Sequence, residues 1–177
     1  MRSANDSRDP DGAPLYPGTC RHLSTDERHA RIAAGHRHVM RLDRVRLADV
    51  IKDDLFYEEY LEGEEPERRS IDLDRWGDAV IARKDVKTSY HLSVVLDDAR
   101  QQVTDVIRGA DLKPATDIHR VLQALLGLPT PRYRHHRLIT DEEGAKLSKS
   151  RGSRALRDLR DEGVTPDAIK RALGFIR

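Results

Sequence analysis

The stretch VTDVIRGADLKPATDIHRVLQALLGLPTPRYRHHRLI, residues 103–139, decides the fold of this 177-residue chain. Its β-branched beginning, residues 103–108, is typical of a strand. A helix follows, which we expect Thr116 to cap and Gly127 to end, with apolar residues on one stripe at positions 118, 121, 122, 125 and 126. A second strand is predicted over residues 133–139. Strand, helix and strand in this order indicate a βαβ unit, and therefore an α/β fold with a parallel sheet.

The regions on either side of this unit contain shorter elements. The order Ser-x-x-Glu at residues 24–27 forms a capping box and predicts a helix that ends near Gly35. Strands are predicted over residues 38–42 and 79–83. Residues 90–96 are apolar without clear periodicity, so they suit either a strand or the start of a helix.

Two helices are expected at the end of the chain. The first covers residues 153–161, and the second begins after Thr165 with Pro166 at its first position. Residues 1–18, by contrast, are rich in Asp, Pro, Gly and Ser and predict a loop.

The composition sets limits on the class of protein. Hydrophobic residues make up 37% of the chain and charged residues 36%, and the formal net charge is +1. Overall charge therefore gives no indication of a nucleic-acid partner, and only local patches can. The single cysteine excludes an internal disulfide framework and suits a reducing compartment. No run approaches the roughly 18 apolar residues of a membrane span, so we expect no membrane association and a cytoplasmic location.

Residues 49–74 form a strongly acidic segment. They hold eleven acidic residues against three basic ones and are interrupted by Gly63 and Pro66. We interpret the segment as a solvated insertion or loop, with an acidic binding surface as the alternative.

The loop DEEGAKLSKS, residues 141–150, is a candidate phosphate-binding site. Lys146 and Lys149 follow a predicted parallel strand, and α/β proteins bind ligands beyond the carboxyl ends of such strands. Two ammonium groups on a loop with Gly144 and Ser148 suit a polyphosphate, whose leaving group they could neutralise. Solvated surface charge is the alternative. Residues 130–154 as a whole hold seven Lys or Arg against three acidic residues, which would also suit an RNA backbone.

Arg108 and Tyr90 are candidates for binding a carboxylate substrate. Arg108 ends a predicted strand just before a glycine, and a guanidinium binds a carboxylate as a fork, with a purely structural arginine as the alternative. Tyr90 offers a hydroxyl and a flat face, although a half-buried core tyrosine is an equal alternative. His135 and His136 lie on alternating faces of their strand, so we do not expect both to bind one metal ion.

Five blocks carry a resemblance to a known family. They occur in the order ARKD, SYHLSVVLDD, VTDVIRGADL, HRVLQALLGLP and KLSKS, at residues 82–85, 89–98, 103–112, 119–129 and 146–150. In this order and spacing they resemble the second half of the catalytic domain of class I glutamyl-tRNA synthetases. More narrowly, they resemble the glutamyl-Q tRNA(Asp) synthetases, which lack an anticodon-binding domain. The likeness covers nearly the whole chain from Tyr16 to its end, apart from the acidic stretch around residues 50–72.

The resemblance implies an ATP-dependent ligase with a Rossmann-like catalytic domain. KLSKS matches the family's KMSKS loop with Leu147 in place of Met, which implies that Lys149, assisted by Lys146 and with Ser148, contacts the phosphates of ATP. Tyr90 and Arg108 match the glutamate-binding Tyr and Arg. The family activates glutamate to glutamyl-adenylate and transfers it to the queuosine base of tRNA(Asp), so the implied partners are glutamate, ATP and tRNA(Asp) or another tRNA.

Two parts of the family pattern are missing from these 177 residues. No His-x-Gly-His occurs, although the family binds ATP with an HIGH-type motif. YPGTCR at residues 16–21 resembles half of the family's zinc site, but Tyr16 and Cys20 supply two ligands where zinc needs four. We therefore expect an amino-terminally truncated family member that does not form glutamyl-adenylate alone, which glutamate-dependent ATP–pyrophosphate exchange measures.

The expected organisation has three parts. Residues 1–75 would be the remnant of a zinc- or acceptor-type insertion with the acidic loop, residues 76–140 the second half of the catalytic domain, and residues 141–177 the KMSKS-type loop and the last helices. Two alternatives remain for the function, a non-catalytic RNA- or nucleotide-binding remnant and a fragment of an ordinary glutamyl-tRNA synthetase.

Overall fold

The computed structural model describes residues 7–61, 64–141, 143–148 and 152–176, which divide into two compact units, residues 1–136 and 137–177. The first unit contains α1 (Thr25–Ala33), β1 (Val39–Arg41), α2 (Arg44–Val50), β2 (Phe56–Glu59), β3 (Glu67–Ser70), β4 (Val80–Arg83), α3 (Tyr90–Arg100), β5 (Asp105–Gly109), a 3₁₀ turn (Ala110–Leu112), α4 (Ala115–Leu126) and β6 (Arg132–His136). The second contains α5 (Leu156–Asp161) and α6 (Pro166–Ala172). No helix of the described residues is long and apolar enough to span a membrane.

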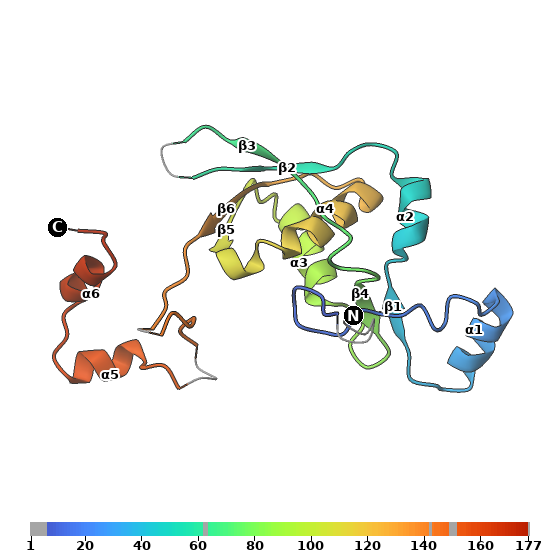
Figure 1. Ribbon diagram of the computed structural model, residues 1–177, viewed down its shortest axis with the longest axis horizontal. Coiled ribbons are helices and arrows are strands. Elements are labelled where there is room, and N and C mark those ends of the chain that lie inside the picture. Colours follow the sequence, from blue (N-terminus) through green and yellow to red (C-terminus); the bar gives the residue numbers. More distant parts are fainter. Residues whose placement is uncertain (1–6, 62–63, 142, 149–151, 177) are drawn as a thin grey trace. The chain divides into compact units, whose positions relative to one another are not determined.

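The predicted βαβ unit is confirmed by strands β5 and β6 and helix α4. The two strands pair in parallel over five residues, from Asp105 opposite Arg132 to Gly109 opposite His136. They form one end of a four-stranded sheet with the order β3-β2-β6-β5 (Figure 1). A separate antiparallel pair, β1 with β4, lies on the other side of helices α3 and α4.

Several further predictions of elements are confirmed. The capping box at Ser24 and Glu27 starts α1, and Thr165 caps α6 with Pro166 at its first position. Gly127 ends α4 in the left-handed conformation, with φ of 62°, which a residue with a Cβ adopts at a cost. Residues 90–96, left open between strand and helix, begin α3, which Ser89 caps.

The interpretation of residues 49–74 as a loop is wrong in part. Strands β2 and β3 form an antiparallel hairpin within this segment, and β2 also pairs in parallel with β6 at Glu59 and Tyr133. Glu59 is only 6% exposed, because Lys113 and Arg69 both bind its carboxylate. These partners replace the water that an isolated buried carboxylate would lose.

Thr116 does not cap α4, contrary to expectation. The helix begins at Ala115, two residues earlier than a cap at Thr116 would place it, and Thr116 is fully buried within its first turn. Its hydroxyl instead accepts a hydrogen bond from Arg108 at 2.6 Å. This threonine therefore makes a tertiary contact instead of capping the start of the helix.

The hydrophobic core lies where α3 and α4 pack together. It is formed by Leu42, Leu47, Trp76, Ala79, Val95, Ala115, Ile118, Val121 and Leu122. The indole N–H of Trp76 donates to the carbonyl of Pro114 at 3.1 Å, and Arg75 binds the buried carboxylate of Asp117 through its Nε at 2.8 Å. The segment before β4 is therefore fastened to the first turn of α4.

One face of the four-stranded sheet is covered and the other is exposed. Tyr57, Tyr133 and His135 are buried on the side of α3 and α4. Ile107, on the opposite side of edge strand β5, is 61% exposed. Buried and exposed side chains therefore alternate along the strands, as in a sheet that packs against other elements on one face only.

Replacing Ile118 by Ala tests the assigned core. Ile118 is 1% exposed, so the substitution leaves a cavity and should lower the free energy of unfolding by about 2–5 kcal/mol. Leu126→Ala is the matched control on the same helix, since Leu126 is 47% exposed and should cost less than about 0.5 kcal/mol. Urea denaturation measures both, and equal losses would contradict the assignment.

Candidate functional site

Arg108 lies near the carboxyl end of β5, and its guanidinium is buried beneath α4. It is 9% exposed and donates through Nε to His135 at 3.3 Å, through Nη1 to His119 at 3.1 Å and through Nη2 to Thr116 at 2.6 Å. The parallel pairing of β5 with β6 brings His135 directly beside Arg108. The sequence placed Arg108 at the end of its strand but gave no sign of this shell of acceptors.

Glu59 and Lys113 extend the cluster on one side. Nδ1 of His135 lies 2.7 Å from Oε1 of Glu59, and the ammonium of Lys113 donates to Oε2 of Glu59 at 2.6 Å. A pocket of about 220 Å³ borders these three residues and Arg69. Glu59 therefore links the acidic hairpin to the βαβ unit.

His119 and His91 extend the cluster on the other side. Nε2 of His119 lies 3.2 Å from Nδ1 of His91, whose own Nε2 lies 3.3 Å from Oδ2 of Asp11. Tyr90 covers this pair, with its ring centroid 5.6 Å from that of His91 and 5.8 Å from that of His119. Since Tyr90 is 51% exposed, it brings the cluster to the surface. The structure thus gathers the two predicted carboxylate-binding residues, Tyr90 and Arg108, around His119.

The three histidines of the cluster are held in their neutral form. Burial and the charge of Arg108 together lower the pKa of His119 to about 2. Burial also lowers the pKa of His135, and it lowers that of His91 more than Asp11 raises it. Burial raises the pKa of Glu59, but hydrogen bonds from Lys113 and His135 leave it below its ordinary value.

The second unit holds the described part of the KLSKS loop. Lys146 forms an isolated bridge with Thr140, and the backbone of Ser148 exchanges hydrogen bonds with Ser153, its N–H donating to Oγ at 2.9 Å and its carbonyl accepting from N–H at 3.2 Å. Lys149, which the resemblance makes the main phosphate contact, lies outside the described residues. The roles of Lys146, Ser148 and Lys149 remain predictions.

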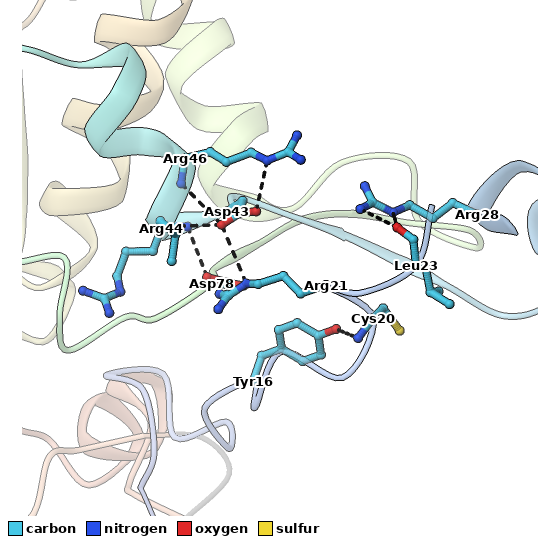
Figure 2. Close-up of polar contacts among 10 residues, drawn as sticks. Tyr16, Cys20, Arg21, Leu23, Arg28, Asp43, Arg44, Arg46 and Asp78 are labelled. Carbon is cyan, nitrogen blue, oxygen red and sulfur yellow. Dashed lines mark hydrogen bonds and ion pairs between the residues drawn. The ribbon is translucent and has the colours of Figure 1, made fainter. Parts of the chain in front are cut away.

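Tyr16 and Cys20, the expected half of a zinc site, hydrogen-bond to one another. The N–H of Cys20 donates to the Tyr16 hydroxyl at 2.6 Å (Figure 2). The guanidinium of Arg41 lies 4.6 Å from the Tyr16 ring centroid. Within the described ranges, no group of three or more His, Cys, Asp or Glu side chains could hold a metal ion.

A groove of about 1110 Å³ runs between α1, β1 and the turn after β4. Its charged lining is mostly basic, with seven Arg or Lys against three Asp: Arg21, Arg28, Arg31, Arg37, Arg41, Arg83, Lys84, Asp43, Asp78 and Asp85. Three histidines, His29, His36 and His38, add further donors. The composition gave no sign of this groove, because the net charge of the chain is close to zero.

Two of the three groove aspartates, Asp43 and Asp78, make structural contacts within the protein. Figure 2 shows that Arg21 lies between Asp43 and Asp78, with its Nη2 2.6 Å from Asp78. Asp43 also caps α2, and Asp78 accepts from the N–H of Arg44. By contrast, Arg37 and Arg83 make no ion pair in the part of the chain that the structure describes. The groove therefore keeps a positive excess that suits a polyanion.

Comparison with known proteins gives a family for the chain. The family model of class I tRNA synthetases (E and Q), catalytic domain, matches residues 1–176. The chain is 57% identical over 99 residues to a glutamyl-Q tRNA(Asp) synthetase of Rhodobacter capsulatus, covering 56% of the chain and 36% of the relative. It is 41% identical over 147 residues to that of Verminephrobacter eiseniae, covering 82% of the chain and 46% of the relative.

Glutamate–tRNA ligases are also similar to the chain. Glutamate–tRNA ligase 2 of Nitrosococcus oceani is 40% identical over 158 residues, which cover 89% of the chain and 31% of the relative. The crystal structure of a glutamate tRNA ligase from Elizabethkingia meningosepticum in complex with its amino acid matches 78% of the chain and 27% of its own, with 26% identity and a TM-score of 0.57. The chain thus spans between about a third and a half of the length of these curated relatives.

The neutral histidines predict that acid destabilises the first unit. His119 binds a proton at about pH 6.5 when unfolded but only near pH 2 when folded, so the unfolded state binds more protons between these values. The free energy of unfolding should fall as the pH falls below about 6.5, by up to about 1.4 kcal/mol per pH unit for each such histidine. Arg108, His91 and His135 face His119 and act in the same direction.

Denaturant titrations at several pH values measure this slope. His119→Asn removes the titrating group and should flatten the pH dependence by about one proton. An exposed histidine, His22, provides the matched control in His22→Asn, which should leave the slope unchanged. A slope unaffected by His119→Asn would contradict the prediction.

Proposed function

Since the chain belongs to the family of class I tRNA synthetases (E and Q), we propose that it carries the glutamate-binding part of an ATP-dependent ligase that glutamylates the queuosine base of tRNA(Asp). The observation that carries the proposal is the arrangement of Arg108 and Tyr90. A buried guanidinium and an exposed tyrosine converge on one cluster, at the carboxyl end of a parallel strand. This is where an α/β protein binds a small anionic substrate.

The donor inventory of Arg108 supports a carboxylate as its ligand. A guanidinium has five N–H groups, and the contacts with His135, His119 and Thr116 use three of them. Nη1 and Nη2 each carry a second N–H, which is the number that a bidentate carboxylate accepts. In glutamyl transfer, Arg108 would hold the side-chain carboxylate of glutamate, because the α-carboxylate reacts with ATP, and Tyr90 would contribute its hydroxyl.

The lysine loop would supply the phosphate chemistry. In this proposal Lys149 and Lys146, with Ser148, bind ATP and neutralise the charge that develops on departing pyrophosphate as glutamate attacks the α-phosphate. The carboxylate oxygen of glutamate forms the new bond to phosphorus, and the bond to pyrophosphate breaks. Transfer to the nucleoside then releases AMP.

The acceptor is proposed from the relatives and from the basic groove. Two of the relatives are glutamyl-Q tRNA(Asp) synthetases, and the basic excess of the groove, with Arg37 and Arg83 outside any ion pair of the described residues, suits a phosphate backbone. An ordinary glutamate–tRNA ligase is the second candidate. The match with the Nitrosococcus oceani protein, which covers 89% of the chain, favours it.

Glutamate binding to residues 1–177 tests the substrate site. Calorimetry should detect glutamate more strongly than glutamine, because the amide cannot accept both hydrogen bonds of the fork. Arg108→Lys keeps the charge but loses the fork, so glutamate affinity should fall about tenfold or more. Tyr90→Phe removes one hydroxyl and should cost about fivefold.

Arg100→Lys provides the matched control for this experiment. Arg100 is exposed at the end of α3, so its substitution should leave glutamate affinity unchanged. Circular dichroism melts confirm that each variant is folded. Equal affinity of the wild-type chain for glutamate and glutamine would overturn the proposed substrate site.

Binding to tRNA tests the groove and separates the two candidate acceptors. Arg37→Ala with Arg83→Ala should weaken binding of queuosine-containing tRNA(Asp) and reduce the slope of log K against log salt by about one per residue. Arg100→Ala, which removes a charge outside the groove, should leave both unchanged. Tighter binding of tRNA(Glu) than of tRNA(Asp) would favour the ordinary ligase, and an unchanged slope would exclude the groove.

A further inference from the structure

Two series of hydrogen bonds begin at the guanidinium of Arg108 and run in opposite directions. Each is a chain of side chains, and the two chains together form a relay. A guanidinium has donors only, so each imidazole nitrogen that faces it must accept. This condition fixes which nitrogen of each neighbouring histidine carries the proton. The two chains can therefore be followed from Arg108 to their ends.

The first chain runs through β6 to the acidic hairpin. Nε2 of His135 accepts from Nε of Arg108, so the proton of the neutral ring is on Nδ1. Nδ1–H then donates to Oε1 of Glu59 at 2.7 Å, and Lys113 binds the other oxygen. His135 thus has the Nδ1–H tautomer.

The second chain runs through α4 and α3. Nδ1 of His119 accepts from Nη1 of Arg108, which puts the proton of His119 on Nε2. Nε2–H donates to Nδ1 of His91, and the Nε2–H of His91 then donates to Asp11 at 3.3 Å. His119 and His91 thus have the opposite tautomer to His135.

We infer that His135, His119 and Glu59 are positioning residues, which hold the guanidinium of Arg108 in a fixed orientation for the substrate carboxylate. The inference rests on the proposed function, in which Arg108 binds glutamate. Three of its N–H groups are fixed by acceptors from β6 and α4, so the plane of the guanidinium cannot turn without breaking hydrogen bonds. Pre-organisation of this kind lowers the entropic cost of binding.

The acceptors around Arg108 are suited to this role because they are neutral. Within the described ranges no carboxylate contacts Arg108 directly, and its acceptors are two imidazoles and a hydroxyl. A carboxylate in direct contact would compete with the carboxylate of the substrate. The two carboxylates that end the chains, Glu59 and Asp11, balance the charge from one or two residues away.

The inference gives the acidic hairpin a role in the site. Glu59 is a buried carboxylate of this hairpin and orients His135, while the ammonium of Lys113 keeps Glu59 ionised. Glu59 itself does not touch Arg108. It acts through His135 and is therefore a positioning residue rather than a catalytic one.

The tautomers test the relay without any ligand. Long-range ¹H–¹⁵N spectra of the ¹⁵N-labelled chain at pH 7 should show His135 as the Nδ1–H tautomer and His119 and His91 as Nε2–H. Glu59→Gln keeps a carbonyl acceptor for Nδ1–H and Glu59→Leu removes it, so only Glu59→Leu should shift the Nδ1 resonance and speed exchange of its proton, while Arg108 keeps His135 in the Nδ1–H tautomer. Averaged or protonated rings in the wild-type chain would overturn the relay.

Glutamate affinity tests the positioning role. His119→Leu removes the acceptor for Nη1 and should weaken glutamate binding about tenfold. His119→Asn places an amide oxygen near the position of Nδ1 and should restore affinity to within about threefold of the wild type. The variants His135→Leu and His135→Gln, whose amide reaches the position of Nε2, form a second pair if His119→Leu does not fold. A merely structural role would lower stability without this rescue pattern.

The outcomes separate this inference from the proposed function. A wild-type chain that does not bind glutamate overturns the proposed function and the positioning role with it, although the tautomers still decide the relay. Glutamate binding with equal affinities in His119→Leu and His119→Asn overturns the positioning role and leaves the proposed function intact.

Discussion

The burial of the Arg108 guanidinium is the constraint on which the arrangement of the first unit depends. A buried charge without partners costs several kcal/mol, so the surrounding elements must provide acceptors and opposite charge. The surrounding elements provide these groups in two layers. Imidazoles and a hydroxyl contact the guanidinium, and carboxylates contact the imidazoles. The positions of β2, β6, α3 and α4 meet this requirement together, because each contributes at least one member of the cluster.

The division of the cluster between neutral and charged groups has a chemical benefit. Hydrogen bonds to neutral acceptors satisfy the donors of a cation while leaving its charge for a ligand, whereas a direct ion pair would satisfy both. The aspartates of the groove show the opposite arrangement, since Asp78 binds Arg21 directly and neutralises it. The protein thus contains one arginine that is paired directly with a carboxylate and another whose hydrogen-bond acceptors are all neutral.

The sequence predicted the βαβ unit well because its signals are local. Strand residues, an apolar stripe and Gly127 each act within a few positions, and the structure follows them. The prediction of a solvated loop around Glu59 and the prediction of a cap at Thr116 were wrong for the complementary reason. An acidic run predicts solvent and a threonine near a helix start predicts a cap, and only partners far along the chain, Lys113 and Arg108, reverse these readings. The candidate residues Tyr90 and Arg108 were proposed from their chemistry and their places beside predicted elements, and family spacing supported them, while His119 and His91 carried no local signal of their contacts.

The pairing of β2 with β6 determines which changes of length the chain tolerates. Side chains along β2 alternate between the covered and the exposed face, with Tyr57 and Glu59 on the covered one. One residue inserted between Tyr57 and Glu59 would place Glu58 or the inserted residue opposite Tyr133 and turn the Glu59 carboxylate towards solvent. Insertions between β2 and β3 would leave this register unchanged. Natural variation in length should therefore concentrate at the tip of the hairpin and avoid the five residues before Tyr60.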